Sequence, residues 1–332
     1  MRVNDYYYQQ LQNEYAITYR NIYDCLKNHS FHCKAPFIDG NKLRNVFGNV
    51  IDDHPELYYV SSKVKGGARS SGGSKFLELG FEELYQIDQR KIDKEISRVV
   101  NDISLKAKGK SELEQHMLIL DYLIENVTYE INNVFNQNAA SAIYYHKAQC
   151  SGISAAYKLI ADSLGLFALI ASSSSNESGV MMPHAWNIVQ IDGLYYHIDA
   201  TSVIGRNKNK EKPYSYKNAF CSDEFFRVNH ILQPGWPKCT DTKYERLSEF
   251  NGNKTSVLKE ICSFYELRSY LTEQVKAHEK NVTFYYKIDM APALFESSLA
   301  NSIKSVFLNL QIPLKSASFS KSGYEVQIQL VY

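Results

Sequence analysis

The spacing of apolar residues along the chain predicts several amphipathic helices. Leu11, Tyr15, Ile22 and Leu26 fall roughly on one face of a helix over residues 6–28. Further helices are expected over residues 88–106, from residue 111 onward, over residues 257–275 and over residues 294–308. The helix after residue 111 carries a run of apolar positions that marks it as core-facing, and Ser111 with Glu114 has the spacing of a capping box.

Other segments follow the pattern of strands and turns. Residues 55–60 and 75–81 are strand-like and flank a Gly- and Ser-rich stretch at residues 65–73, so we expect a hairpin with a mobile tip. Residues 323–332 alternate apolar and polar side chains, which predicts a closing strand. A strand is also expected over residues 282–288.

The segment that begins at Cys150 predicts a helix with a reactive residue at its start. Its apolar residues recur at helical spacing from Ile153 to Leu164, and Gly165 is a natural C-terminal stop. Cys150 therefore lies at the helix N-terminus, where free N–H groups and the helix dipole favour an anion. Such a position lowers a thiol pKa, and the same N–H groups can hold the oxyanion of an attacked carbonyl.

A two-residue turn downstream brings a histidine and a carboxylate together. Asp192 and Gly193 separate two β-rich runs, which predicts a hairpin in which Ile191 faces Leu194. Extending this register pairs Trp186 with Asp199 and His184 with Thr201. The side chains expected on one face are those of His184, Trp186, Tyr195, His197, Asp199 and Thr201. His184 and Asp199 then become diagonal neighbours, with Cα atoms roughly 7–8 Å apart.

An imidazole oriented by a carboxylate is the partner that a cysteine nucleophile needs. The prediction depends on the turn, because a three-residue loop would place His184 and Asp199 on opposite faces of the hairpin. A stretch at residues 172–182 joins two expected strands beside the site. It is polar and contains glycine, so we expect a mobile flap over the cleft.

At this point the motifs resemble those of the transglutaminase-like superfamily, within the papain-like cysteine enzymes. The matching segments are Cys150-Ser151-Gly152, His184-Ala185-Trp186-Asn187 and His197-Ile198-Asp199-Ala200-Thr201. Residues 220–230 and 54–60 are similar to stretches of bacterial multi-domain relatives. The resemblance implies an α+β fold in which the nucleophile helix packs on an antiparallel sheet. It also implies acyl chemistry on an amide through a thioester, with Cys150 as nucleophile, His184 as general base and acid, and Asp199 as its orienting partner.

The remaining candidates have less specific signals. Gln149, Trp186 and His197 are candidates for substrate contacts, with core packing the alternative for Trp186 and His197. We expect His230 and Asp223 to be structural. The spacing of Cys221, His230 and Cys239 fits no standard zinc pattern, and no acidic calcium loop occurs, so neither a metal nor another cofactor is expected.

Composition narrows the class of partner and the location. Lys and Arg total 37 and Asp and Glu total 36, so no basic field exists to hold nucleic acid or an anionic membrane. The longest apolar runs are too short for a membrane span. The six cysteines lack a framework spacing, and the N-terminus lacks a signal-peptide pattern. This favours a cytoplasmic location, or secretion if the sequence begins after a removed signal peptide.

These observations predict three regions: an N-terminal helix and hairpin region over residues 1–110, a catalytic core over residues 111–250 and a small α/β domain over residues 251–332. The function expected is that of a cysteine protease, amidase or acyltransferase acting on a protein or peptide. The competing hypothesis is a non-catalytic module that keeps the fold and binds a peptide or protein. Arylamine acetyl transfer is disfavoured, because the sequence around Cys150 lacks the Arg-Gly-Gly motif of that family. The substrate, the acyl acceptor and the oligomeric state are not determined by the sequence.

Overall fold

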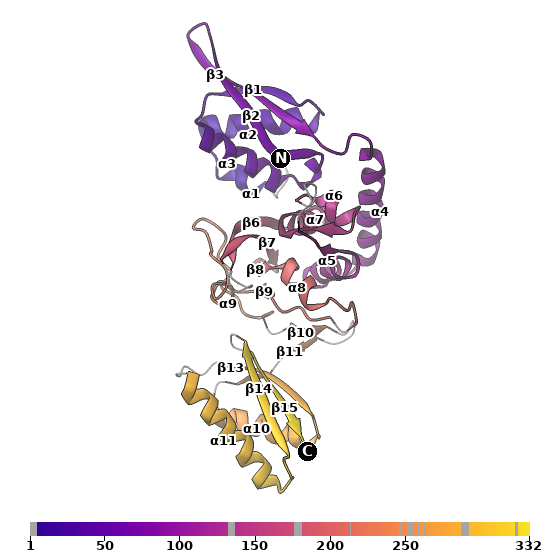
Figure 1. The fold of residues 1–332 in the computed structure, drawn as a ribbon, viewed down its shortest axis with the longest axis vertical. Helices are drawn as coiled ribbons and strands as arrows, with labels where there is room; N and C mark the ends of the chain where they lie inside the picture. Colours follow the sequence, from indigo (N-terminus) through magenta and orange to yellow (C-terminus); the bar gives the residue numbers. More distant parts are fainter. Residues whose placement is uncertain are drawn as a thin grey trace. The chain divides into compact units, whose positions relative to one another are not determined.

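The computed structural model describes residues 5–131, 137–175, 181–212, 214–245, 247–250, 255–257, 259–261, 263–286, 292–322 and 325–332. Two compact units divide the chain, Met1–Glu245 and Arg246–Tyr332 (Figure 1). Helices and mainly antiparallel sheets make up both units, so the predicted α+β class is confirmed. The three-region division remains a prediction.

The first unit begins with a helical layer beside a small sheet. The expected helix over residues 6–28 is in fact two helices, α1 (Tyr6–Gln9) and α2 (Asn13–Lys27), because the chain is extended at Gln12 and Asn13 has a positive φ of 50°. Strand β1 (His32–Pro36) and helix α3 (Gly40–Asp53) follow, and neither was predicted. Helix α3 is capped by Asp39, whose carboxylate accepts the N–H groups of Asn41 and Lys42.

The predicted hairpin forms, but with different bounds. Of the strand expected over residues 55–60, only Val60 is in a strand: Pro55–Leu57 is a 3-10 helix, and strand β2 runs over Val60–Ser71. Most of the expected Gly- and Ser-rich loop is therefore strand, paired with β3 (Ser74–Glu83). Only Gly72 and Gly73 form the turn, since both adopt the positive φ that a tight hairpin requires. The sheet order is β1-β3-β2.

A helical layer leads to the cysteine. Helix α4 (Gln89–Ala107) and helix α5 (Glu112–Asn126) confirm the predicted pair, and Ser111 with Glu114 forms both bonds of the capping box. A short parallel pair, β4 (Thr128–Tyr129) and β5 (Lys147–Ala148), flanks helix α6 (Ala139–Ile143). Helix α7 (Cys150–Ser163) follows directly and packs on α5 and α6.

An antiparallel sheet supports helix α7. Its strands are β6 (Ala168–Ser175), β7 (Met182–Ile191), β8 (Leu194–Ile198) and β9 (Ala219–Cys221), in that order across the sheet. Short helices α8 (Ala200–Arg206) and α9 (Asp223–Phe226) follow β8 and β9. The expected flap differs from the structure, because residues 172–175 and Met182 belong to paired strands; residues 176–180 lie outside the described residues.

The second unit has its own core. Strands β10 (Leu247–Phe250) and β11 (Thr255–Val257) pair with each other. A four-stranded sheet of order β12-β13-β15-β14 contains β12 (Lys259–Ile261), β13 (Asn281–Tyr286), β14 (Ser316–Ser322) and β15 (Glu325–Val331). Helices α10 (Phe264–Lys276) and α11 (Pro292–Leu310) complete the unit. The predicted helix over residues 257–275 thus begins later, and β14 was not predicted.

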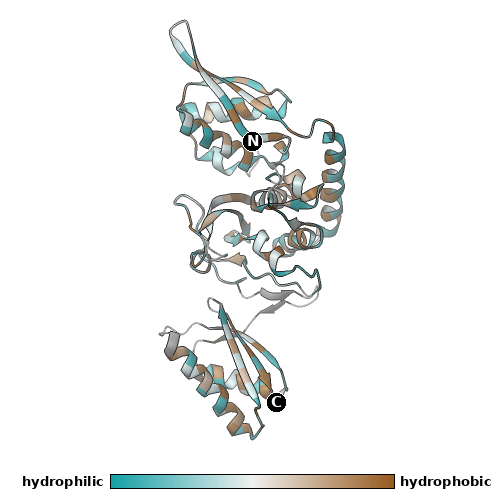
Figure 2. Ribbon diagram, viewed as in Figure 1, coloured by the Kyte–Doolittle hydropathy of each residue, from teal (hydrophilic) through white to brown (hydrophobic). Residues whose placement is uncertain are grey.

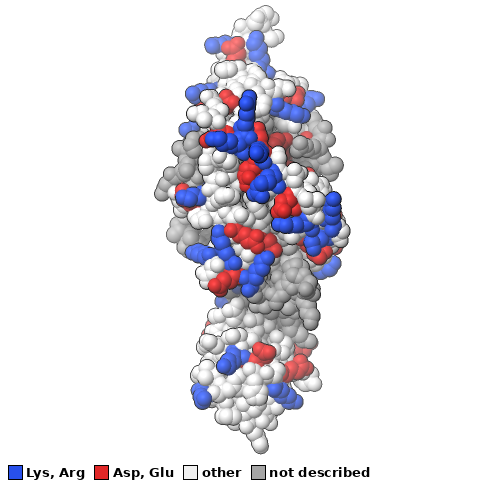
Figure 3. All heavy atoms as spheres, turned by 90° about the vertical axis from the view of Figure 1, so that its right-hand side faces the viewer, with Lys and Arg blue, Asp and Glu red and all other residues white. Residues whose placement is uncertain are grey.

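Apolar side chains of this sheet and of both helices form the core of the second unit. Figure 2 colours the ribbon by hydropathy, and hydrophobic residues recur along these strands and helices. Among the residues described, no helix combines the length and the hydropathy that crossing a bilayer requires. Basic and acidic side chains are interspersed on the face of the molecule in Figure 3, in keeping with their nearly equal numbers. On helix α4, for example, Arg98 pairs with Glu95 and Lys106 with Asp102.

Candidate active site

Cys150 is the first residue of helix α7. Its N-cap, Gln149, is extended, and within the described residues the Gln149 side chain makes no capping bond. The helix is anchored by a fully buried face that includes Ile153, Ala156 and Ile160. It ends as predicted at Gly165, whose φ of 76° allows Leu166 N–H to bond the carbonyl of Ala161. Cys150 is therefore held at the N-terminus of a rigid helix, and the thiol remains partly exposed.

The hairpin after this helix has the predicted register. Asp192 and Gly193 both have positive φ, at 52° and 81°, and Ile191 pairs with Leu194. The buried side chain of Asn187 ties the hairpin to its neighbours, since its amide nitrogen donates to the carbonyls of Ser154 in α7 and Leu169 in β6. The histidine strand and the cysteine helix are thereby fixed to each other.

The structure corrects one part of the predicted pairing. Strand β8 ends at Ile198, so the expected opposition of Trp186 with Asp199 and of His184 with Thr201 does not form. Asp199 is instead the N-cap of helix α8, and its Oδ1 accepts the N–H of Ser202 at 3.1 Å. The capping bond turns the chain into a helix where the alternating pattern alone predicted further strand.

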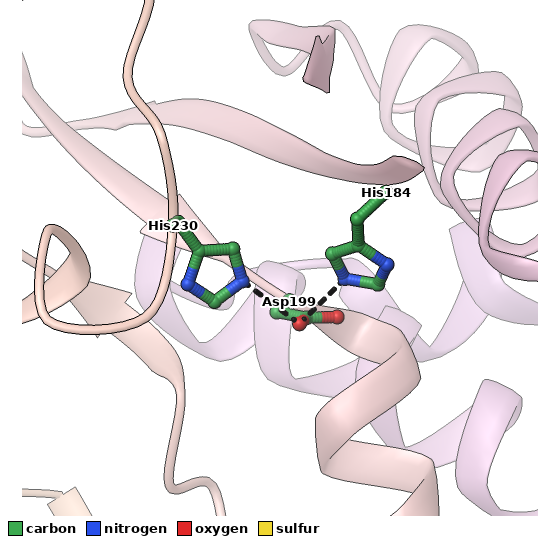
Figure 4. Close-up of side chains that lie close together, drawn as sticks. All are labelled: His184, Asp199 and His230. Carbon is green, nitrogen blue, oxygen red and sulfur yellow. Dashed lines mark hydrogen bonds and ion pairs between the residues drawn. The ribbon is translucent and has the colours of Figure 1, made fainter. Parts of the chain in front are cut away.

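Asp199 nevertheless reaches His184. Its Oδ2 lies 2.8 Å from His184 Nε2, with His184 12% exposed and Asp199 fully buried (Figure 4). The same oxygen lies 3.3 Å from His230 Nε2 and accepts the Ser202 hydroxyl at 2.8 Å. Because Nε2 of His184 is engaged by Asp199, Nδ1 is the ring nitrogen left for another partner.

The buried carboxylate is held in its charged form. Burial alone would raise the pKa of Asp199, but hydrogen bonds from His184 and His230 outweigh it and leave that pKa well below its usual range. An ionised Asp199 stabilises a positive charge on His184, as an orienting carboxylate does for a catalytic imidazole.

The pKa of the Cys150 thiol and the pKa of the His184 imidazole are shifted in opposite directions. Burial opposes the charge on His184, but hydrogen bonds with Asp199 and Cys150 raise its pKa to about 10. Burial likewise opposes a Cys150 thiolate, but the hydrogen bond with His184 and the N–H groups of Ala185 and Ser151 lower its pKa below the ordinary value. The site thus favours a thiolate beside an imidazolium.

The three substrate-contact candidates differ in their surroundings. Gln149 is partly exposed beside Cys150. Trp186 is fully buried, and its indole N–H donates to His197 Nδ1 at 3.1 Å. His197 is also buried and must then donate from Nε2 to Asp223 at 3.0 Å. Burial lowers the pKa of His197 despite the nearby Asp223, so a neutral imidazole is favoured. This geometry supports packing for Trp186 and His197.

Sequence reasoning missed the position of His230. It was expected to tie a loop to the core, and it does pair with Ser175 through a β-bridge. Its ring, however, stacks on Phe226 with 3.9 Å between ring centroids and directs Nε2 at Asp199. The signal in the sequence that could have pointed to His230 is its position in residues 220–230, the segment similar to a stretch of bacterial multi-domain relatives.

Tyr129 also escaped the sequence analysis. It lies in strand β4, paired with Ala148 just before the cysteine helix, and it is 43% exposed. Burial and then the charges of Cys150 and Asp199 raise the pKa of its phenol. No local pattern marks it, because only the β4–β5 pairing brings it to the site.

Two clusters have donor atoms close enough to consider a metal ion: His184, Asp199 and His230, and separately His197, Asp223 and Cys239. In the first cluster, both histidines and Ser202 point hydrogen-bond donors at a single carboxylate oxygen. In the second, both ring nitrogens of His197 already have hydrogen-bond partners. Hydrogen bonding accounts for both arrangements, and the absence of a metal remains a prediction.

Comparison with known proteins gives only distant likenesses. No family model matches the chain, and no curated protein matches it. Among solved structures, a crystal structure of a TGase is similar at 19% identity over 51% of this chain and 50% of that one, with a TM-score of 0.29. A proposed cysteine protease from Cytophaga hutchinsonii matches at 18% identity over 42% of this chain and 61% of that one, with a TM-score of 0.28.

A third match is the periplasmic domain of TgpA from Pseudomonas aeruginosa, at 10% identity over 45% of this chain and 66% of that one, with a TM-score of 0.27. Each alignment covers less than two thirds of the matched chain. Likeness at this level does not establish an activity. We therefore base a functional proposal on the contacts within this chain, which join a cysteine at a helix start, a histidine in a strand and an aspartate at the next helix cap.

Proposed function

We propose that this chain is a transglutaminase-like cysteine enzyme that attacks a peptide or side-chain amide through a thioester. The observation that carries the proposal is the position of His184, whose Nε2 lies 2.8 Å from Asp199 Oδ2 and whose pKa is raised by Asp199 and Cys150 together. A thiolate at a helix N-terminus beside an oriented imidazolium is equipped for nucleophilic attack and for proton donation.

In the first half of the reaction, the Cys150 thiolate attacks the amide carbonyl carbon and a C–S bond forms. The carbonyl oxygen becomes an oxyanion, for which the free N–H groups at the start of helix α7 are suitable donors. The C–N bond then breaks, and the proton on His184 Nδ1 goes to the leaving nitrogen, so that an amine departs and a thioester remains. Asp199 keeps the imidazole in the required tautomer throughout.

In the second half, neutral His184 takes a proton from the acyl acceptor. With water as acceptor the product is a carboxylic acid, and with an amine it is a new amide; in both cases the thiolate is released. Peptidase or amidase activity and acyl transfer therefore share the same machinery. The two are separated by incubating the enzyme with a peptide substrate and a primary amine, and by measuring the ratio of acid to new amide by mass spectrometry.

Alkylation of the thiol tests the proposal directly. We expect iodoacetamide to modify Cys150 well below the ~8.5 pKa of a free thiol, and His184→Ala to slow this reaction. His32→Ala, at an exposed position, is the matched control. Cys33, Cys221 and Cys239 are internal references, because burial raises the pKa of each. Cys262 lies outside the described residues.

The competing hypothesis of a non-catalytic binding module makes the opposite prediction. If Cys150 reacts no faster than an ordinary thiol and is indifferent to the loss of His184, the enzyme proposal is wrong and the binding module takes its place.

A further inference from the structure

A pocket of about 300 Å³ lies beside the cysteine helix, within the first unit. One wall comes from the N-terminal elements, from the end of α3 through the 3-10 helix to β2 and β3. The opposite wall comes from Ser151 and Ala155 of helix α7 and from Ile170 of β6. Ser151 directly follows Cys150 in the sequence, so the pocket reaches the first turn of the helix that begins with the nucleophile. Its size is at the lower end of the range for small-ligand sites.

One carboxylate in this pocket has no partner among the described residues. Asp52 is half-buried and lines the pocket, and its carboxylate makes no hydrogen bond or ion pair within the part of the chain that the structure describes. Burial, and then the charge of Asp53, raise its pKa to about 7 in spite of the positive charge on Lys158. A partly buried carboxylate without a counter-charge is unfavourable unless something else neutralises it.

The charged neighbours of Asp52 are already engaged. Asp53 accepts the N–H groups of Tyr7 and Tyr8 and the hydroxyl of Tyr19. The Lys158 ammonium is bound to Asp162 and to the carbonyl of Ala168, 2.9 Å away. Neither residue satisfies the Asp52 carboxylate.

The other ionisable groups that line the pocket do not pair with the Asp52 carboxylate either. His54 is buried, stacks on Tyr23 and lies 3.3 Å from Glu56 through Nδ1. Lys63 and Glu82 are exposed, carry opposite charges and belong to the strand side of the pocket. Asp52 is therefore the partly buried acidic group that a ligand would meet.

We propose that this pocket binds a primary ammonium group of the substrate, with Asp52 as its counter-ion, beside the amide that Cys150 attacks. An alkylammonium chain matches both the volume and the chemistry: methylene groups fit against Ala155 and Ile170, and the ammonium supplies the donors that Asp52 lacks. The proposal rests on the proposed function. The ammonium comes either from a lysine side chain of the peptide or from one amino group of a diamine whose other, neutral amine accepts the acyl group.

Charged and neutral alkylating probes of the same length test this. We expect an iodoacetamide with a terminal ammonium on an alkyl chain to modify Cys150 about tenfold faster than its uncharged analogue, the effect of about 1.4 kcal/mol of binding energy. A series of chain lengths finds the best fit to the pocket. Asp52→Asn should abolish the preference and leave the rate with the neutral probe unchanged. Asp24→Asn, which removes an exposed carboxylate outside the pocket, should keep the preference.

The pocket can also be tested without any reaction. With Cys150→Ala, titration calorimetry of the full chain should detect Nα-acetyl-lysinamide but not Nα-acetyl-norleucinamide, and Asp52→Asn should remove this binding. If Cys150 is inert to every probe yet the lysine amide binds through Asp52, the catalytic proposal fails and the pocket stands. If Cys150 is reactive but neither charged ligand is preferred, the pocket proposal is overturned.

The two sources of the ammonium give different kinetics. A lysine of the peptide would raise kcat/KM for peptides that carry it, and Asp52→Asn would remove the gain. A diamine acceptor bound through its ammonium would instead raise the yield of new amide over acid, with the same sensitivity to Asp52→Asn.

Discussion

His184 and Asp199 are in contact although 15 residues separate them in the sequence, with 2.8 Å between Nε2 and Oδ2. The two side chains come from different kinds of element, since His184 lies in strand β7 and Asp199 is the cap of helix α8. The Asp199 carboxylate therefore has two roles. Its Oδ1 caps helix α8 by accepting the N–H of Ser202, and its Oδ2 orients the imidazole of His184. A change at this position affects both, unless the replacement preserves the cap.

Asp199→Asn separates these tasks. Asparagine is a good N-cap, so helix α8 should remain, but a neutral amide cannot stabilise a charged His184. We expect turnover, and alkylation of Cys150 at neutral pH, to fall by on the order of 100-fold or more. Asp102→Asn on exposed α4 serves as control. Circular dichroism establishes that the fold is retained, and an unchanged rate would contradict the assigned role.

The opposite pKa shifts of Cys150 and His184 predict a characteristic pH dependence. Acidification through the lowered pKa of Cys150 protonates the thiolate, so alkylation and turnover both decline. Raising the pH through about 10 removes the proton from His184, so turnover loses its general acid while the thiolate remains available for alkylation. Turnover should therefore give a bell-shaped profile and alkylation only an acidic limb. A basic limb in both profiles would contradict this assignment.

His230 is expected to act as a positioning residue through Asp199. His230→Phe keeps the stacking on Phe226 but removes the donor, and a hydrogen bond worth about 1 kcal/mol corresponds to roughly a fivefold loss of turnover. Because His230 lowers the pKa of Asp199, its loss makes the carboxylate a stronger partner for His184. The basic limb of the turnover profile should therefore move to higher pH.

A conservative replacement distinguishes positioning from structure. His230→Gln restores an N–H donor and should recover much of the rate and the original limb. The Tm of both variants is measured in parallel. If His230 has only a structural role, both replacements change the Tm and the basic limb of the turnover profile stays at its original pH.

Asp52→Asn is predicted to stabilise the protein. The folded-state pKa of Asp52, about 7, lies above its ordinary value, so ionisation costs folded-state stability from pH 4 upward and the full cost is reached above pH 7. The stabilisation by Asp52→Asn should be small at acidic pH and largest above neutral pH. A gain of about 1 kcal/mol raises Tm by about 2–4 °C in a unit of this size. Equal gains at both pH values would argue against an ionised, unpartnered Asp52.

Trp186→Phe tests whether Trp186 acts by packing. The side chain is fully buried and donates to His197, so truncation leaves a cavity and an unpaired acceptor. We expect a loss of about 1–3 kcal/mol in the free energy of unfolding, measured by chemical denaturation. The Cys150 alkylation rate of the folded variant should stay close to that of the wild type. A large change in rate at full stability would instead favour a substrate contact.

Local patterns explain why part of the site was predictable. The start of helix α7 follows from the apolar period after Ile153 and from Gly165, and the hairpin register follows from Asp192-Gly193. Each depends on neighbours in sequence, where capping and turn geometry act. The alternating pattern predicted that the strand continues through Asp199, and this was wrong. The Asp199 carboxylate accepts the backbone N–H of Ser202 and thereby starts a helix at this position.

The sequence by itself determined the candidate residues and their order: a cysteine at a helix start, a histidine in a strand and an aspartate at the end of the next strand-like run. Only the tertiary structure decided what surrounds them. A β-bridge holds the segment of His230 beside Asp199, and a parallel strand pair places Tyr129 before the cysteine helix. Asp52 lines a pocket formed by the N-terminal elements and helix α7. These contacts join residues distant in sequence, and the burial that shifts their pKa values exists only once the chain has folded.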